Sequence, residues 1–218
     1  MRVAVAGAGK VGRAIARELV GNGHDVLLID KDAELARPGV VDGAGSLLAD
    51  ACEVSALDEA RLAECQVVVA ATGDDKVNLV VSLLAKTEFG VPRVVARVNH
   101  PKNEWMFDES WGVDVAVSTP RMLSALVEEA VSVGDLVRLF TFRQGAAELV
   151  EMTLPSTSPV VGHSTASIDW PQDTVPVAVV RGTHVKTPDA SLVLEAGDEL
   201  LFVAAPEREA ELQALLGH

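Results

Sequence analysis

The stretch VAVAGAGKVG, residues 3–12, decides the fold of this 218-residue chain. It joins an apolar run to a GxGxxG turn, and helical periodicity begins inside the turn, so it predicts a strand, a tight turn and a helix. Gly7 allows the turn, Gly9 lets the backbone approach a pyrophosphate, and Gly12 lets the helix pack closely on the strand. Free N–H groups and the positive end of the helix would stabilise phosphate there. The stretch therefore predicts a nucleotide-binding turn.

An acidic residue lies at the position where nucleotide-binding units of this kind carry one. Asp30 ends the second apolar run, and its oxygens can accept hydrogen bonds from ribose hydroxyls. A carboxylate there repels a 2′-phosphate, which favours NAD or an adenine nucleotide over NADP, although the adjacent Lys31 weakens this preference. The alternative is a glycine turn that only packs a helix on a sheet. The order and spacing of strand, turn, helix and acid favour a nucleotide-binding turn over this alternative.

Outward from this turn, short apolar runs alternate with helical periodicity, which is typical of βαβ units and a parallel sheet. Strands are expected at 3–6, 26–29, 46–48, 67–71, 94–98 and 113–117. After Gly134 strands alternate with turns, at 136–142, 148–154, 175–181, 191–194 and 199–204, before a short helix at 206–216. We therefore expect an α/β fold in which a Rossmann-like parallel-sheet domain (1–135) precedes a small, mostly β α+β domain (136–218).

The helix at the junction carries an apolar stripe that includes Leu123, Leu126 and Val127. Neither half of the chain offers this stripe an obvious partner. We expect it to serve either domain packing or a dimer contact.

Polar loops follow two further strands of the expected parallel sheet. Asp50 and Ala51 come after the third strand, and Thr72, Gly73, Asp74 and Asp75 come after the fourth. Ligands of open α/β sheets lie beyond the carboxyl ends of the strands, so these loops should line one crevice.

Two more polar residues leave alternatives open. Arg97 interrupts the fifth apolar run, so it either pairs with a carboxylate such as Asp74 or faces a bound phosphate. Asn78 is either a helix-start cap or part of the site.

Composition restricts the classes of function. The 32 Asp and Glu residues outnumber the 18 Lys and Arg residues, and the net charge of −14 argues against a nucleic acid partner. The longest apolar run, 200–205, is far shorter than the roughly 20 residues of a membrane helix, and the first residues lack a signal-peptide pattern. Cys52 and Cys65 lack metal-site spacing. We expect a cytoplasmic protein without a metal site.

Taken together, these features resemble the RCK domains of the TrkA and KtrA family. Residues 1 to about 132 are similar to the N-terminal nucleotide-binding domain, and 136–218 to the C-terminal domain. The first part carries GAGKVG (7–12), LIDKD (28–32), ADA (49–51), AATGDD (70–75) with Asn78, VARV (95–98) and VSTP (117–120). The second part carries PVVG (159–162), VVRG (179–182) and LEAGDEL (194–200).

The resemblance implies a regulatory subunit, not an enzyme, at the inner face of the membrane. Such subunits assemble from dimers into rings, commonly octameric, beneath a Trk- or Ktr-type potassium channel or transporter, and exchange of one nucleotide, NAD(H) or ATP/ADP, for another gates it. Carried over by position, the site comprises Gly7, Gly9, Lys10, Val11, Gly12, Asp30, Lys31, Asp50, Ala51, Thr72, Gly73 and Arg97. Relatives bind a second small ligand, sometimes a cyclic dinucleotide, in the second domain, where Arg181, His184 and Pro188 are the residues to examine, unless they are simply solvated turn residues.

Three places depart from the family's pattern. Lys10 stands where ATP-responsive relatives often have Arg, which replaces a bidentate contact with a terminal phosphate by a point charge. Arg121 follows Pro120 where relatives often have Glu, so a metal site is not expected there. Residues 36–39 contain a helix breaker, Pro38, where a longer helix is usual.

An NAD-dependent oxidoreductase is the alternative class, because the same turn and acid serve hydride transfer. Such an enzyme needs a proton donor placed against its substrate, and none of the five histidines lies in a constellation with an acid or a nucleophile. The second half is also small for a substrate domain. The sequence favours binding over turnover.

Overall fold

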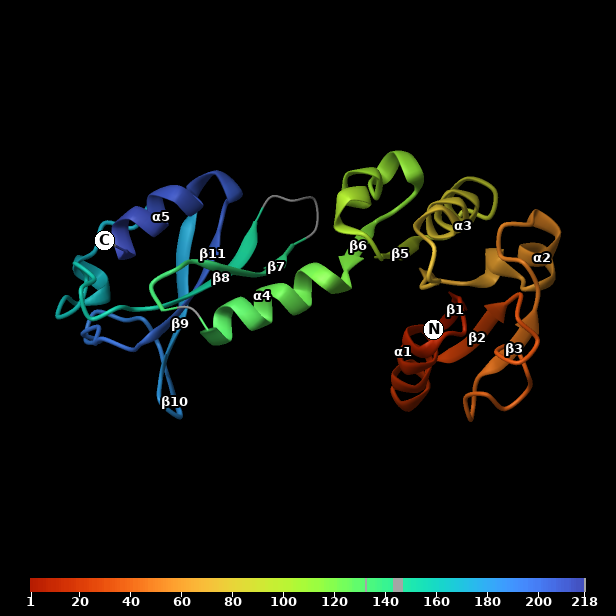
Figure 1. The fold of residues 1–218 in the computed structure, drawn as a ribbon, viewed down its shortest axis with the longest axis horizontal. Helices are drawn as coiled ribbons and strands as arrows, with labels where there is room; N and C mark the ends of the chain where they lie inside the picture. Colours follow the sequence, from red (N-terminus) through yellow and green to blue (C-terminus); the bar gives the residue numbers. More distant parts are fainter. Residues whose placement is uncertain (132, 143–146, 218) are drawn as a thin grey trace. The chain divides into compact units, whose positions relative to one another are not determined.

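The computed structural model describes residues 1–131, 133–142 and 147–217. Its contacts divide the chain into two compact units, Met1–Pro120 and Arg121–His218, and Figure 1 shows the elements of each. The division falls at the start of helix α4 (Thr119–Val131), whereas the boundary expected after residue 135 keeps that helix with the first domain. The domain limits 1–135 and 136–218 stay a prediction.

The first unit is built on a parallel sheet. Its strands are β1 (Arg2–Ala6), β2 (Asp25–Asp30), β3 (Gly45–Leu48), β4 (Val67–Ala70), β5 (Arg93–Val98) and β6 (Val115–Ser118). They lie in the order β3-β2-β1-β4-β5-β6, and each neighbouring pair is parallel. This is the strand order of a Rossmann fold, which confirms the predicted fold class.

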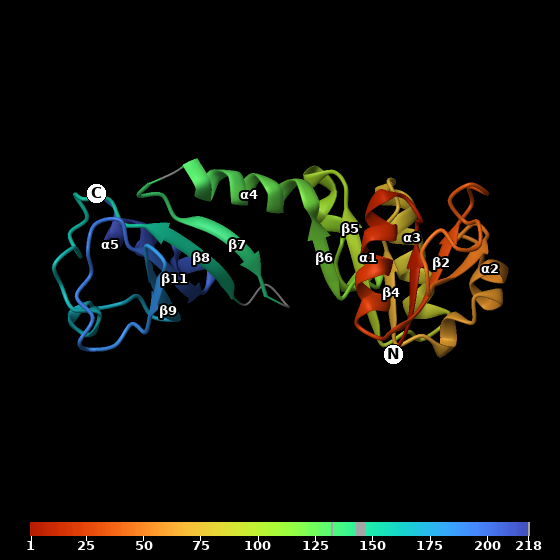
Figure 2. The same cartoon turned by 90° about the horizontal axis from the view of Figure 1, so that it is seen from below.

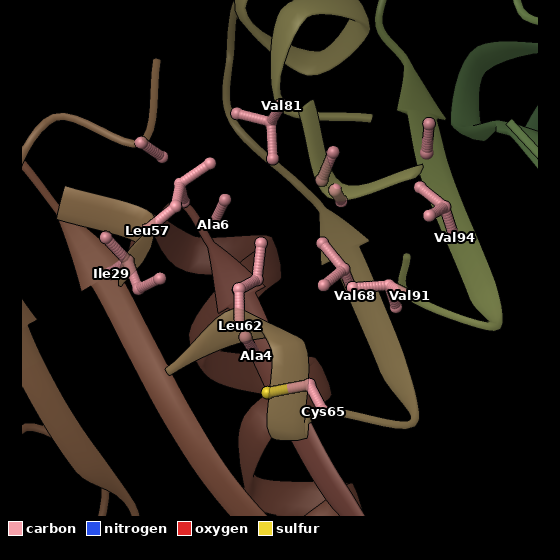
Figure 3. Close-up of a cluster of buried hydrophobic side chains, with 14 of the residues drawn as sticks. Ala4, Ala6, Ile29, Leu57, Leu62, Cys65, Val68, Val81, Val91 and Val94 are labelled. Carbon is pink, nitrogen blue, oxygen red and sulfur yellow. The ribbon is translucent and has the colours of Figure 1, made fainter. Parts of the chain in front are cut away.

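Helices cover both faces of this sheet. α1 (Lys10–Gly21) packs on one face, where Ala16 is buried with Val5 and Leu28. α2 (Val54–Glu59), the 3-10 turn η1 (Leu62–Glu64) and α3 (Asp75–Thr87) cover the other, through the cluster drawn in Figure 3. The central strands are buried on both sides, which explains why they are apolar at consecutive positions rather than alternating.

Two connections complete the first unit. Residues 31–44, all of them described, form turns without a helix between β2 and β3, as the helix breaker Pro38 predicts. Between β5 and β6 lie two 3-10 segments, η2 (Pro101–Met106) and η3 (Glu109–Trp111).

The described part of the second unit contains an antiparallel sheet. Its strands are β7 (Val137–Thr141), β8 (Glu148–Thr153), β9 (Thr174–Arg181), β10 (His184–Lys186) and β11 (Glu199–Ala204), in the order β10-β9-β11-β8-β7. η5 (Thr165–Ser167) precedes β9, and η6 (Pro206–Arg208) leads into α5 (Glu209–Leu216). Figure 2 shows α5 and the strands β7, β8, β9 and β11 from a second side. Leu212 and Leu216 of α5 are buried in one cluster with Met152 and Phe202. The mostly β second domain is confirmed.

The strand expected at 191–194 is wrong. Val193 makes only an isolated bridge to Ser164, and no named strand includes it. A strand forms instead at β10, because Gly182 adopts a φ of 58° and turns the chain back so that His184 pairs with Arg181. A short apolar run beside a turn does not distinguish a strand from a loop held by single hydrogen bonds.

The apolar stripe of α4 is exposed in the single chain. Leu123, Leu126 and Val127 have exposed fractions of 59%, 54% and 62%.

Among the described residues, no helix combines the length and the apolar character needed to cross a bilayer.

Candidate functional site

A cavity of about 620 Å³ lies at the carboxyl ends of the parallel strands. Its walls come from the loops that follow β1, β2, β3 and β4, and from Arg97 in β5. The strand order reverses between β1 and β4, which is where open α/β sheets bind ligands. All the residues predicted for the site line this cavity except Gly12. Of the two acids expected in the loop after β4, Asp74 lines the cavity, whereas Asp75 is buried and does not. Five further residues line the cavity that the sequence alone does not assign to it: Ile29, Leu35, Ala49, Ala71 and Val77.

The three glycines of the turn serve two different roles. Gly7 has a φ of 100°, and a Cβ there would lie 2.8 Å from the backbone nitrogen of Thr72. Gly12 lies outside the cavity, and a Cβ on it would lie 1.8 Å from the carbonyl oxygen of Gly7. Gly9 lines the cavity and has open space where its Cβ would be. Gly7 and Gly12 are therefore required by packing, while Gly9 keeps the backbone accessible to a ligand.

The first turn of α1 presents positive potential to the cavity. Gly9 provides no side-chain cap, and no acidic residue lies in the first turn. The backbone N–H groups at the start of a helix lack intrahelical acceptors and carry the positive end of the helix dipole. Lys10 is exposed beside them and lines the same cavity. This end of the cavity is suited to an anion.

Asp30 joins β2 to the glycine turn. One of its carboxylate oxygens accepts a hydrogen bond from the Ala8 N–H at 2.6 Å, and the other accepts one from the Asp32 N–H at 2.9 Å. The carboxylate is half-buried and lines the cavity next to Lys31. A carboxylate held in this way keeps further lone pairs for ligand hydroxyl groups.

Asp50 and Ala51 form the wall after β3. Asp50 Oδ1 accepts a hydrogen bond from the Cys52 N–H at 2.9 Å, which fixes this short loop. Burial, together with the Asp50 carboxylate, raises the pKa of the Cys52 thiol, so the thiol stays protonated at neutral pH. Cys52 and Cys65 are both free.

Asn78 joins the loop after β4 to strand β5. Its side chain is fully buried, and its Oδ1 accepts from the Thr72 N–H at 2.9 Å and from the Thr72 hydroxyl at 2.6 Å. Its Nδ2 donates to the carbonyl oxygen of Arg97 at 2.8 Å. The cap of α3 is instead Asp74, which accepts from the Lys76 N–H. Asn78 is therefore not the cap of α3; it lies in the first turn of this helix and does not itself line the cavity.

Arg97 reaches the cavity without an acidic partner. Its Nε is buried and makes no hydrogen bond, and no carboxylate in the described part of the chain lies within ion-pair distance of it. The pairing with Asp74, one of the two alternatives for Arg97, does not form. A buried cationic nitrogen without a partner is costly, and an anionic ligand in the cavity would satisfy it.

Asp75 anchors the chain beyond β5. This buried carboxylate accepts hydrogen bonds from the backbone N–H groups of Asn99 and His100 and from the side-chain amides of Asn99 and Asn103. Burial raises the pKa of Asp75, but these hydrogen bonds lower it by more, so that the pKa lies below its ordinary value. Asn99 also donates to the carbonyl oxygen of Thr72 at 3.0 Å.

In the second unit, Arg181 is part of an ion pair. Its Nε and Nη2 each donate to the fully buried carboxylate of Asp198 at 2.7 Å, and its Nη1 pairs with Glu195. Burial raises the pKa of Asp198, but the contacts with Arg181 bring the pKa below its ordinary value. Arg181 is thus neither a solvated turn residue nor a free ligand for an anion. His184 is exposed and Pro188 half-buried.

The family model of the TrkA-N domain matches residues 3–119, over half of the chain. The chain belongs to the TrkA family. The model of the TrkA-C domain matches residues 149–217. The Trk system potassium uptake protein TrkA of Mycobacterium tuberculosis is 58% identical to this TrkA family member over 216 residues, which cover 99% of this chain and 98% of the relative.

Solved structures share the fold of this TrkA family member. The GsuK channel bound to NAD matches with a TM-score of 0.71 at 18% identity, over 100% of this chain and 39% of that chain. GsuK bound to ADP matches with a TM-score of 0.50 at 24% identity, over 59% of this chain and 34% of that chain. These likenesses establish the fold alone. Family membership confirms that the chain is a regulatory protein and not an enzyme, so the oxidoreductase alternative is set aside.

Proposed function

We propose that this TrkA family member is a cytoplasmic, nucleotide-responsive subunit that regulates a Trk-type potassium channel or transporter in the membrane. The observation that carries the proposal is the cavity lined both by Arg97, whose Nε has no partner, and by the start of α1, which has no side-chain cap. The name of the Mycobacterium tuberculosis relative supports the part of the proposal that concerns potassium uptake. The NAD-bound and ADP-bound GsuK structures support the choice of nucleotides.

The lining of the cavity suits an adenine nucleotide, with NAD(H) and ATP/ADP as the candidates. The glycine turn and Lys10 would hold a pyrophosphate at the start of α1. The carboxylate of Asp30 would accept hydrogen bonds from ribose hydroxyls, beside Lys31, and it disfavours a 2′-phosphate. The adenosine would lie towards Asp50 and Ala51, because these residues follow the outer strand β3.

Regulation requires that two nucleotides bind two states of the protein with different affinities, since a ligand shifts an equilibrium only by its differential affinity. We propose that the two states belong to a homo-oligomer, with a dimer as its building block and an octameric ring as the assembly. The exposed stripe of Leu123, Leu126 and Val127 on α4 supports a contact between copies.

Calorimetric titration of the nucleotide-stripped protein with NAD, NADH, ATP and ADP tests this proposal, together with the oligomeric mass in each state. We expect at least two of the nucleotides to bind, with different affinities or with different masses of the assembly. Absence of binding by all four nucleotides would exclude a nucleotide sensor. Equal affinities and one unchanged mass would exclude the proposed regulation.

A further inference from the structure

Asn78 makes four polar contacts from one fully buried side chain. Its Oδ1 takes up both the N–H and the hydroxyl of Thr72, and its Nδ2 donates to the carbonyl oxygens of Arg97 and Thr72, at 2.8 and 3.3 Å. Its amide is therefore saturated inside the protein, and it does not itself line the cavity. Any effect of Asn78 on a ligand acts through the residues that it holds.

The residues that it holds lie on one side of the cavity. Thr72 follows β4 and Arg97 belongs to β5, whereas Asp30 ends β2 and Asp50 follows β3. The strand order β3-β2-β1-β4-β5-β6 places the glycine turn after β1 between these two sides. A nucleotide whose first phosphates lie on the turn has its adenosine towards β2 and β3, and whatever lies beyond those phosphates towards β4 and β5.

From this arrangement we infer that Asn78 is a positioning residue for the part of the nucleotide beyond the adenosine monophosphate. The hydrogen bond from its Nδ2 fixes the backbone of Arg97, so that a guanidinium whose Nε has no protein partner faces the cavity. The two bonds to its Oδ1 withdraw the N–H and the hydroxyl hydrogen of Thr72 from the ligand. Asn78 thereby sets the discrimination between AMP and longer nucleotides. This inference rests on the proposed function.

Variants of Asn78 are expected to fold, because the loop keeps other anchors. Asn99 donates to the carbonyl oxygen of Thr72 at 3.0 Å, and Asp75 holds Asn99 through its backbone and its side chain. Ser82 offers a matched control, since it is equally buried in α3 and its hydroxyl donates to the carbonyl oxygen of Asn78 at 2.7 Å.

The experiment is calorimetric titration of the full chain with AMP, ATP and NAD in wild type, Asn78→Ala, Asn78→Asp and Ser82→Ala. In Asn78→Ala we expect the affinity for ATP and NAD to fall about tenfold while the affinity for AMP changes by less than about twofold. Asn78→Asp keeps an acceptor for Thr72 but loses the amide donor to Arg97, so we expect the same selective loss. It also replaces Asn78→Ala if the alanine variant does not fold. Ser82→Ala should keep the wild-type ratio of affinities.

A double variant tests whether Asn78 acts through Arg97. Arg97→Ala should show the same selective loss of affinity for ATP and NAD. Adding Asn78→Ala to Arg97→Ala should lower these affinities little further, because both substitutions act on the same contact between Arg97 and the ligand. An equal loss for AMP, ATP and NAD in the Asn78 variants would make Asn78 merely structural and overturn the inference, as would an unchanged ratio. If the wild-type protein bound none of the three, the proposed function would fail and this inference with it.

Discussion

The carboxylate of Asp30 lies 2.6 Å from the backbone nitrogen of Ala8, from which it accepts a hydrogen bond. This contact joins the end of β2 to the centre of the glycine turn. The group proposed to bind ribose therefore also holds the turn proposed to bind phosphate, so the two halves of the site depend on one side chain.

Replacement of Asp30 by Ala should weaken binding of every adenine nucleotide. The variant loses the acceptor for ribose and the contact with Ala8, and a hydrogen bond to a charged group contributes about 1.5–3 kcal/mol, or tenfold and more in affinity. Calorimetry measures this loss. Asp32→Ala is the matched control, because it removes the same charge two residues later from a side chain that accepts a hydrogen bond from the Glu34 N–H outside the cavity. Equal affinities in wild type and Asp30→Ala would exclude the ribose contact.

Substitutions at Gly12 and Gly9 should separate stability from binding. Gly12→Ala places a Cβ 1.8 Å from the Gly7 carbonyl oxygen, and we expect the free energy of unfolding to fall by about 3 kcal/mol or more. Gly9→Ala meets open space, so its cost should stay below about 1 kcal/mol while nucleotide affinity falls. Denaturant unfolding and calorimetry measure the two effects. A stable Gly12→Ala protein would contradict the packing role.

Removal of Arg181 should destabilise the second unit. Arg181→Ala leaves the fully buried carboxylate of Asp198 without its cation, and loss of one partner of a buried pair costs about 3 kcal/mol. Denaturant unfolding, followed by the fluorescence of Trp170, measures the change. Arg208→Ala, which removes an exposed pair with Glu211, should cost less than about 0.5 kcal/mol. Similar values for both variants would contradict this role of Arg181.

Asp75 should make the stability of the first unit sensitive to acid. Hydrogen bonds outweigh burial and hold the pKa of Asp75 below its ordinary value of 3.8. A carboxyl group with a lowered pKa in the folded state stabilises it above the pKa of the unfolded state, and this contribution is lost as the pH falls through the folded-state pKa. The advantage of wild type over Asp75→Asn in urea unfolding, followed by Trp111, should therefore be greatest above about pH 5 and shrink on acidification. A difference independent of pH would refute this assignment.

Leu126→Asp should reduce the oligomeric mass. Leu126 is 54% exposed in the single chain, so the substitution should leave the stability of the protomer within about 0.5 kcal/mol while placing a charge in the proposed contact between copies. Light scattering after size-exclusion chromatography measures the mass. Ser124→Asp adds the same charge at another exposed position of α4 and should leave the assembly intact. An unchanged mass for Leu126→Asp would exclude the α4 stripe from the interface.

Local sequence patterns were sufficient to predict the strands of the first unit, but they predicted those of the second unit less well. Strands β1 to β6 are mostly apolar runs separated by glycines and helical stripes, and their order follows the rules for βαβ units. In the second unit the apolar run at 191–194 looked like a strand, while the exposed segment His184–Lys186 forms one. The difference is physical, because pairing of a short edge strand depends on the turn at Gly182 and not on its own hydrophobicity.

The sequence by itself determined the Rossmann-like unit, the glycine turn and the acid after β2, because each depends on residues close together in the chain. Only the tertiary structure decided what Arg97, Asn78 and Arg181 do. Arg97 is 19 positions from Asn78, and Arg181 is 17 positions from Asp198, and no periodicity links them. Polar side chains inside a protein take the partners that folding brings within hydrogen-bond distance, so their roles become visible only when distant segments meet.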